Sequence, residues 1–367
     1  MKKKPRAGKA SVDKATTELF RMSRKKALGR AEAERRPFEE RKILSVVTGG
    51  SGRLGRYLVK ALLERGEQVR VLQHAGRKAD FPEGVEVVQG DLLDRASLES
   101  AVDGADYVYH LAAIVDPGTP YDRLLDVNYH GTRNLLEACR SRAYHMQRFV
   151  FISSISVYGK DLAEIPADEE TAENPTDNYG RSKLLAEQAV GQYAEKVPYV
   201  ILRPGVIYAP GFDEAYLPVL KALEHGKMRI VGSGDNSIPF IHASDVVRAM
   251  LLASRAEKAV GDKYVIAPAE RKTQKQVFEI ACRCLGVRPP GAHISAWLAK
   301  LNLKFARLAG AISGSRPKIT EEYIDILASN RVFRTDKAKE DLGFEPKVAL
   351  EDGIREMVDY YRSKGGA

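Results

Sequence analysis

Apolar and polar positions alternate in blocks between residues 42 and 204. Short apolar runs predict buried strands, and turn residues or amphipathic stretches separate them. The expected strands cover residues 43–47, 68–73, 85–89, 107–113, 148–154 and 199–204. Helices are expected over 53–65, over 121–141 and from about Tyr179 onward. Strands that alternate with helices predict an α/β fold built on a doubly wound parallel sheet.

After Pro204 this alternation weakens. Residues 206–236 and 268–345 contain loops, short helices and much of the proline and glycine. Open α/β sheets bind ligands beyond the carboxyl ends of their strands, so these residues predict a smaller subdomain that covers that edge. The predicted division is a basic N-terminal extension (1–42), a sheet domain (43–205) and a mainly substrate-binding part (206–363), from which 237–267 returns to the sheet. A helix is expected over 244–254, with Ser244 or Asp245 as its N-cap.

The stretch 294–312 has the spacing of an amphipathic helix. Lys300, Lys304 and Arg307 lie off its apolar side, which holds Ile294, Trp297, Leu298, Leu301, Phe305, Leu308 and Ile312. Most such stripes are core, so the simplest interpretation is a helix packed on the subdomain's own core. An apolar substrate pocket and contact with a membrane surface stay open as alternatives.

Composition narrows the class of protein. The 367 residues are 44% hydrophobic, which is enough for a sizeable core. Cys139, Cys282 and Cys284 form no CxxC pair and no metal-ligand set, so we expect no metal site, reduced thiols and a cytoplasmic protein. No run of 18 apolar residues predicts a transmembrane helix. The N-terminus "MKKKPRAGKA" precedes no apolar segment of a secretory signal.

The net charge of +9 is concentrated in residues 1–42, which hold 15 Lys/Arg and 6 Asp/Glu. A basic extension of this kind can attract nucleic acid or anionic lipid. The simpler interpretation is a solvated tail or a helix laid on the body, because residues 12–22 carry apolar side chains at helical spacing.

A glycine-rich turn follows the first expected strand, in "VTGGSGRLG". Gly49, Gly52 and Gly55 permit a tight turn and let the backbone approach a pyrophosphate at the start of the next helix. A strand before the glycines and a helix after them make this spacing specific for a dinucleotide. The expected contacts include Ser51, Arg53 and Leu54.

The second expected strand ends in "VLQHAGRK", where NAD-binding folds place an acid on the ribose 2′-hydroxyl. His74 stands there and Arg77 follows, so a 2′-phosphate suits the loop and we favour NADP over NAD. In "GDLLD", Asp91 ends a strand and can accept a hydrogen bond from the adenine amino group. For Asp94, the second acid of this segment, the competing interpretation is the N-cap of the following helix.

Tyr179 and Lys183, in "DNYGRSKLLAE", share one helix face. A phenol with a pKa of about 10 is a poor base at neutral pH, but a nearby ammonium group favours the phenolate. Upstream, "FISSISVYG" leaves Ser153 and Ser154 at a strand end, where a hydroxyl can bond a substrate oxygen. Asn128 lies inside a helix, where it could hold a relay water or simply pack.

The chain repeats the YxxxK spacing once more, near its C-terminus. Tyr360 and Lys364 have no strand-end serine before them. We therefore interpret the second pair as coincidence.

Taken together, "TGGSGRLG", "GDLLD", "HLAA", "VNYHGT", "SSISVYG", "YGRSK" and "LRPGVIYAPG" resemble the extended short-chain dehydrogenase/reductase family, also called the NAD-dependent epimerase/dehydratase family. The resemblance covers about 43–363. It implies a Rossmann domain with a nicotinamide dinucleotide, Tyr179 as catalytic acid/base, Lys183 as its partner and Ser154 as the hydroxyl that binds the substrate oxygen, with Ser153 still possible. It also implies dimers and further dinucleotide contacts from Leu92, Leu111, Ala112, Ala113, Pro204 and Val206.

Departures from the family's patterns narrow the reaction. Sugar-nucleotide dehydratases place an Asp-Glu pair after the serine, where this chain has Ile155 and Ser156. Nucleotide-sugar epimerases carry an asparagine near Val206 and an arginine near Ile238, both of which serve the sugar nucleotide. Without such donors a diphosphate is poorly held. Other segments are similar to the branch of 3β-hydroxysteroid dehydrogenases and dihydroflavonol-type reductases.

Three functions follow from this pattern. The first is an NAD(P)-dependent oxidoreductase that interconverts a secondary alcohol and a ketone. The second is a nucleotide-sugar epimerase with tightly held NAD. The third is a non-catalytic NAD(P) sensor or scaffold whose basic extension binds nucleic acid; a sensor has no need of the tyrosine, lysine and serine together.

Overall fold

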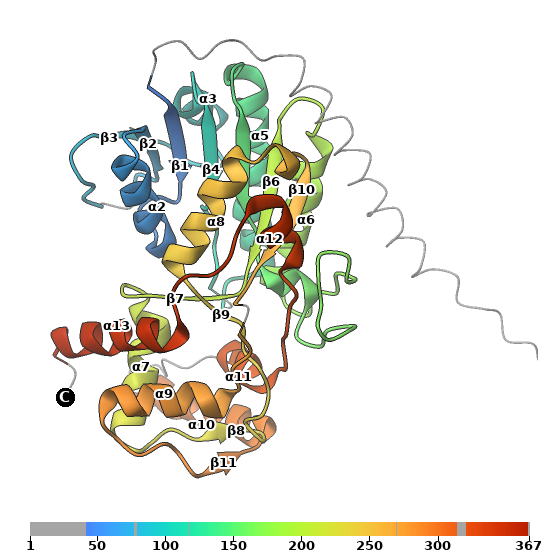
Figure 1. Cartoon of the computed structure of the whole chain (residues 1–367). Helices are drawn as coiled ribbons and strands as arrows, with labels where there is room; N and C mark the ends of the chain where they lie inside the picture. The colour runs from blue at the N-terminus through green and yellow to red at the C-terminus, as the bar shows by residue number, and fades with distance from the viewer. Residues whose placement is uncertain (1–41, 77–78, 117, 269, 314–320, 366–367) are drawn as a thin grey trace, which may run out of the picture.

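The structure, a computed structural model, describes residues 42–76, 79–116, 118–268, 270–313 and 321–365. The basic extension 1–41 and Arg77 lie outside these ranges. At the centre is one sheet of seven parallel strands (Figure 1). Their order is β10 (Asp262–Ile266), β6 (Tyr199–Pro204), β5 (Arg148–Ile152), β4 (Tyr107–His110), β1 (Leu44–Thr48), β2 (Gln68–Gln73) and β3 (Val85–Gln89). The prediction of a doubly wound parallel sheet is confirmed.

Helices cover both faces of the sheet. Successive strand side chains point to opposite faces, so Val47 and Val71 join one core while Val46 and Leu72 join the other. The first core packs under α2 (Arg53–Glu64), α8 (Ala243–Arg255) and α12 (Asp336–Leu342). The second packs under α3 (Arg95–Val102), α5 (Gly131–Arg142) and α6 (Asn178–Gln192).

Several element boundaries differ from the sequence prediction. The strand expected over 107–113 ends at His110, and the one expected over 148–154 ends at Ile152, so the residues beyond them are loops at the sheet edge. The helix expected over 121–141 divides into α4 (Tyr121–Leu124), a π-helical turn η1 (Leu125–His130) and α5. Such turns are frequent at functional sites.

The expected N-cap of α8 was wrong. His242, rather than Ser244 or Asp245, caps the helix, and its Nδ1 accepts the Ser244 N–H at 3.3 Å. The Asp245 carboxylate accepts the backbone N–H groups of Lys347 and Val348 at 2.8 and 3.0 Å. Asp245 therefore ties α8 to the C-terminal segment.

A smaller subdomain lies at the carboxyl edge of the sheet (Figure 1). Its core is shared by α7 (Asp213–Glu224), α9 (Gln274–Leu285), α10 (Ala296–Ser313), α11 (Glu321–Ala328) and α13 (Leu350–Ser363). Two small parallel pairs accompany them, β7 (Val206–Tyr208) with β9 (Phe240–His242) and β8 (Ile230–Val231) with β11 (His293–Ile294). The chain returns to the large sheet through α8 and β10 and again through α12. The domain boundaries given above stay predictions.

Helix α10 packs on the subdomain core through a side other than the predicted apolar stripe. Ala296, Ala299 and Leu303 contact that core, whereas Trp297 and Phe305, on the other side of the helix, are exposed. The prediction of a helix packed on the subdomain core is therefore confirmed, but the side that packs is not the one predicted. Within the described ranges, no helix combines the length and the apolarity needed to cross a bilayer.

Candidate active site

The carboxyl ends of parallel strands meet at one edge of the sheet, and the predicted site residues gather there. The glycine turn follows β1, Leu111–Ala113 follow β4, and the two serines follow β5. His74 follows β2, Asp91 follows β3, and Pro204 ends β6. The predicted dinucleotide-binding residues that follow these strands therefore lie on one edge, as a single elongated ligand requires.

The turn between β1 and α2 is shaped for close approach. Gly49 has φ +73°, and a Cβ there would lie 2.6 Å from the backbone nitrogen of Ala112. A Cβ on Gly55 would lie 2.2 Å from the Gly49 carbonyl oxygen. Gly52 caps α2 without a side-chain hydrogen bond, and the first turn carries no acid. The positive end of α2 is thus left open to an anion, which fits the pyrophosphate of a dinucleotide.

Arg53 and Leu54, neighbours at the start of α2, have different surroundings. Leu54 packs against the core beneath α2. The Arg53 side chain pairs with Glu214 of α7 and lies 5.9 Å from the Phe212 ring centre. Arg53 therefore links the phosphate turn to the smaller subdomain.

The end of the edge nearest β2 and β3 carries a histidine–carboxylate contact. His74 Nδ1 accepts the Gly76 N–H at 3.0 Å, so Nε2 carries the hydrogen that it donates to Asp91 Oδ2 at 3.1 Å. Asp91 also accepts the Leu93 N–H at 2.9 Å. Asp94 caps α3 by accepting the Ala96 N–H at 3.1 Å, as predicted.

Tyr179 and Lys183 lie at the start of α6. Asp177 caps this helix by accepting the Gly180 N–H at 2.7 Å. Tyr179 is partly exposed, whereas Lys183 is buried with Nζ 4.1 Å from the Phe151 ring centre. Burial lowers the pKa of Lys183 to about 7, and the nearby Glu187 carboxylate opposes this shift. The lysine is therefore poised to change charge near neutral pH.

The two candidate serines have different environments. Ser154 is partly exposed; its Oγ accepts the Ser156 N–H at 3.1 Å and donates to Ser156 Oγ at 3.0 Å. Ser153 is buried, and its Oγ has no hydrogen-bond partner among the described residues. Ser154, together with Ser156, offers the accessible hydroxyls at this strand end.

Both hydrogens of the Asn128 side-chain amide are already donated. Its Oδ1 accepts the Ile114 N–H at 2.8 Å, and its Nδ2 donates to the Ile114 carbonyl and to Ser182 Oγ, both at 3.0 Å. No amide hydrogen remains to hold a relay water. Of the alternatives left open above, this geometry favours packing: Asn128 fixes the loop after β4 against α6.

A buried ion network behind Lys183 was missed in the sequence. Arg203 is fully buried; its Nε donates to Glu187 Oε1 at 2.9 Å, and Nη2 donates to Glu173 Oε1 at 2.6 Å. Lys263 Nζ donates to the same Glu173 oxygen at 2.7 Å. The available signal was the spacing, because Glu187 follows Lys183 by four residues on the same helix face.

A model of the NAD dependent epimerase/dehydratase family matches residues 45–267, more than half of the chain. The chain belongs to this family. The resemblance stated from the motifs is confirmed, and the protein is an enzyme of a family of NAD-dependent dehydrogenases, reductases and epimerases.

Relatives extend the likeness beyond the matched residues. A 2-alkyl-3-oxoalkanoate reductase of Stenotrophomonas maltophilia is 28% identical over 338 residues, covering 85% of this chain and 97% of the relative. The Homo sapiens sterol-4-alpha-carboxylate 3-dehydrogenase, decarboxylating, is 29% identical over 331 residues, covering 86% and 87%. A solved UDP-glucose 4-epimerase of Thermotoga maritima has a TM-score of 0.71 at 24% identity, covering 88% of this chain and 99% of that one. This last likeness shows the fold.

The second YxxxK pair lies at the end of α13, where Tyr360 is in the last turn and Lys364 is the C-cap. Tyr360 Oη donates to Asp213 Oδ2 of α7 at 3.2 Å, and Lys364 Nζ lies 5.3 Å from the Tyr360 ring centre. Tyr360 thus offers a matched control for Tyr179.

We expect Lys183→Met to stabilise the fold by roughly 1–2 kcal/mol at neutral pH, because the buried amine is desolvated and Arg203 continues to pair Glu187. The folded pKa of Lys183, about 7, lies below the unfolded value of about 10.4. Between these values the unfolded chain binds more protons, so stability rises with pH. Chemical unfolding across this range should show that rise in the wild type and a flatter profile in the variant; a less stable variant would contradict the assignment.

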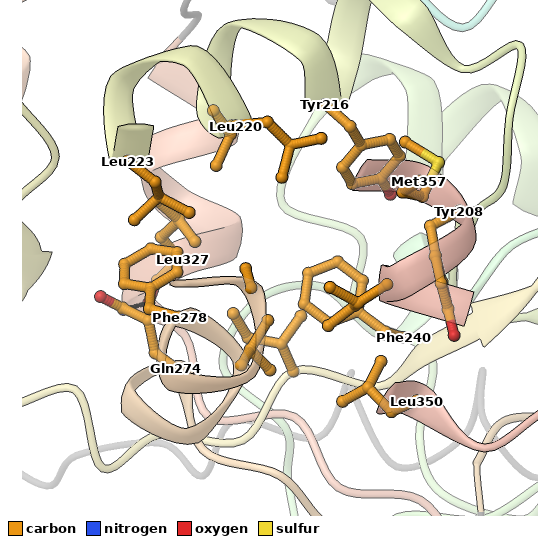
Figure 2. A pocket seen from close by; sticks show the side chains of 15 residues that line it. Tyr208, Tyr216, Leu220, Leu223, Phe240, Gln274, Phe278, Leu327, Leu350 and Met357 are labelled. Atoms are coloured by element: carbon orange, nitrogen blue, oxygen red, sulfur yellow. Dashed lines mark hydrogen bonds between the residues drawn. The ribbon is translucent and has the colours of Figure 1, made fainter. Parts of the chain in front are cut away.

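A separate cavity of about 60 Å³ lies inside the smaller subdomain (Figure 2). Apolar side chains from α7, α9, α13 and β9 line it, among them Leu220, Phe278, Met357 and Phe240. None of the predicted site residues that the structure describes lines it. The cavity is therefore distinct from the strand-end site.

Proposed function

We propose that the protein is an NAD(P)-dependent oxidoreductase of the extended short-chain type that interconverts a secondary alcohol and a ketone. One observation carries the proposal. Tyr179 and buried Lys183 begin α6, and the accessible Ser154 hydroxyl ends β5, at the strand edge whose glycine turn fits a pyrophosphate.

Each side chain then has a defined task. Ser154 Oγ holds the substrate oxygen, and Tyr179 Oη gives a proton to that oxygen during reduction or takes it during oxidation. Lys183 in its charged form favours the phenolate and binds the nicotinamide ribose. When bound, the nicotinamide supplies or accepts the hydride. Asn128 positions the loop after β4 rather than exchanging protons.

The surroundings support this function over nucleotide-sugar epimerisation. Ile238, which stands where such epimerases carry an arginine, is buried in the smaller subdomain's core. Arg203 is committed to Glu187 and Glu173 and is unavailable to a diphosphate. An oxidoreductase with a largely apolar substrate needs neither arginine.

The substrate class follows from chemistry that two relatives' names share. A 2-alkyl-3-oxoalkanoate and a sterol 4-carboxylate oxidised at carbon 3 both carry the reacting oxygen on the carbon β to a carboxylate. We propose a 3-oxo or 3-hydroxy acid with an apolar body as the substrate of this chain.

Purified protein tests the function directly. The expected result is a co-purifying or added dinucleotide, identified by mass, and NAD(P)H consumption with a 2-alkyl-3-oxo acid. Thermal stabilisation by UDP-sugars together with no turnover of any ketone would overturn the proposal in favour of an epimerase.

We propose NADP as the preferred cofactor, because a histidine rather than an acid follows β2. An acid at this position would accept the ribose 2′-hydroxyl and repel a 2′-phosphate. We expect His74→Asp to shift the ratio of kcat/KM for NADPH over NADH toward NADH by at least about ten-fold. His225→Asp makes the same charge change on an exposed residue of α7's end and should leave the ratio unchanged. An unaltered ratio in His74→Asp would contradict this role.

Three further features belong to the same proposal. The enzyme works in the cytoplasm, in keeping with free Cys139, Cys282 and Cys284. It forms homodimers, as the family resemblance implies. The basic extension 1–42 contacts an anionic surface and is not required for catalysis.

A further inference from the structure

Helix α10 is apolar on two opposite sides. Ala296, Ala299 and Leu303 contact the core of the smaller subdomain, and Leu303 is 6% exposed. At 100° per residue, Trp297, Leu298 and Phe305 fall on the opposite side. The fold therefore covers one apolar side and leaves the other outward.

The outward side of α10 carries large apolar side chains that are exposed to solvent. Trp297 is 72% exposed, Phe305 63% and Leu298 41%. These three residues are here called the α10 face. They lie on one side of the helix at spacings of one, seven and eight residues. Clustered aromatic and aliphatic side chains on one surface mark a site for a partner or a membrane.

Charge indicates which partner fits. Between Glu279 and Glu321 the chain holds seven Lys/Arg residues and no Asp or Glu. Of the lysines on α10, Lys300 pairs with Asp325 at 2.6 Å, while Lys304 is exposed beside the α10 face. A Trp/Phe/Leu surface flanked by the exposed Lys304, within a sequence stretch that has no acidic residue, matches the interface of an anionic lipid bilayer, where aromatic rings settle at the headgroups.

We propose that the α10 face docks the enzyme on anionic phospholipid membranes as a peripheral protein. The apolar side chains enter the headgroup region and the basic residues face the lipid phosphates. In this arrangement α10 lies in the plane of the membrane interface and does not cross the bilayer.

The other available occupants fit the charge less well. A second copy bound through the same face would bring two acid-free basic segments together. The N-terminal extension, with 15 Lys/Arg against 6 Asp/Glu, would meet the same repulsion. Both become outcomes of the test.

The chain carries its own reporter, because Trp297 is its single tryptophan. The full chain is titrated with phosphatidylcholine vesicles with and without phosphatidylserine, while tryptophan emission and cosedimentation are recorded. We expect a blue shift and binding with phosphatidylserine vesicles, weakened by salt, and little with phosphatidylcholine alone.

Variants separate this surface from non-specific attraction. Leu298→Ser/Phe305→Ser keeps Trp297 and should weaken binding by at least about ten-fold. Tyr144→Ser removes an equally exposed aromatic elsewhere and should bind as the wild type does. Because all three positions are exposed, unchanged thermal unfolding checks that the variants are folded.

Three outcomes overturn the proposal. The first is vesicle binding that the double substitution leaves intact, with no tryptophan shift, since binding then comes from the basic extension alone. The second is a dimer in sedimentation that the double substitution dissociates, which assigns the face to a second copy. The third is a tryptophan shift on deleting residues 1–41 without lipid, which assigns it to the extension.

Discussion

Tyr179→Phe is expected to lower turnover by roughly 10²- to 10⁴-fold while dinucleotide affinity stays within a few-fold of wild type. The substitution removes only the hydroxyl that exchanges a proton with the substrate oxygen. The ring remains on α6, and the glycine turn that fits the pyrophosphate is untouched. Steady-state kinetics with the identified ketone and calorimetric titration of the dinucleotide measure the two quantities separately.

The matched control for this substitution is Tyr360→Phe, which makes the same change in the second YxxxK pair. Its hydroxyl bonds Asp213 on α7, and we place it outside the chemistry. It should retain full turnover. Equal losses in both variants, or full activity in Tyr179→Phe, would remove the basis for the catalytic assignment.

Arg203→Met is expected to lower the free energy of unfolding by about 3–5 kcal/mol. The change leaves Glu187 buried without the guanidinium that accompanies it, while Lys263 still pairs Glu173. Tyr158 Oη also loses the hydrogen that Arg203 Nη1 donates at 2.7 Å. Urea unfolding of wild type and variant gives the difference directly.

Removing both partners tests whether an unpaired charge is the cause. Arg203→Met/Glu187→Met leaves no buried carboxylate stranded and should recover at least about half of the loss. A double variant as unstable as Arg203→Met would point to lost packing around the guanidinium instead.

The same network gives an acid dependence with a definite sign. Burial opposes the shift, but Arg203 and Lys263 together lower the pKa of Glu173 to about 2. Because this lies below the unfolded value of about 4.3, Glu173 stabilises the fold above that pH and loses its contribution as the pH falls toward 2. The difference in unfolding midpoint between wild type and Arg203→Met should therefore be smaller at acid pH than at neutral pH.

Activity and stability are opposed at Lys183. Its amine is desolvated against the Phe151 ring, and the Glu187 carboxylate that supports its charge is already paired with Arg203. Such a residue lowers stability and is retained for function. The expected stabilisation of Lys183→Met and the loss of turnover in the same variant would together show this trade-off.

The local sequence pattern was sufficient to predict the strands of the sheet and the main candidate site residues. Strands at 68–73, 85–89 and 199–204 were placed to the residue, because β-branched residues are concentrated in short segments bounded by turn residues. Glycine spacing located the phosphate turn, and helical spacing put Tyr179 and Lys183 on one face. These features depend on residues that are near one another in the chain.

Features that depend on distant contacts needed the folded chain. In the sequence Arg203 is indistinguishable from other strand residues. Its ion pair forms only because β6 packs beside α6, where Arg203 Nε donates to Glu187. The sequence allowed Asn128 either to hold a relay water or to pack. In the fold its amide is hydrogen-bonded to Ile114 and Ser182, which favours packing. The α10 stripe satisfied the pattern of a core helix, yet Ala296, Ala299 and Leu303, which lie outside that stripe, contact the core. Periodicity states that a helix has an apolar side, but only packing against the other elements determines which side is covered.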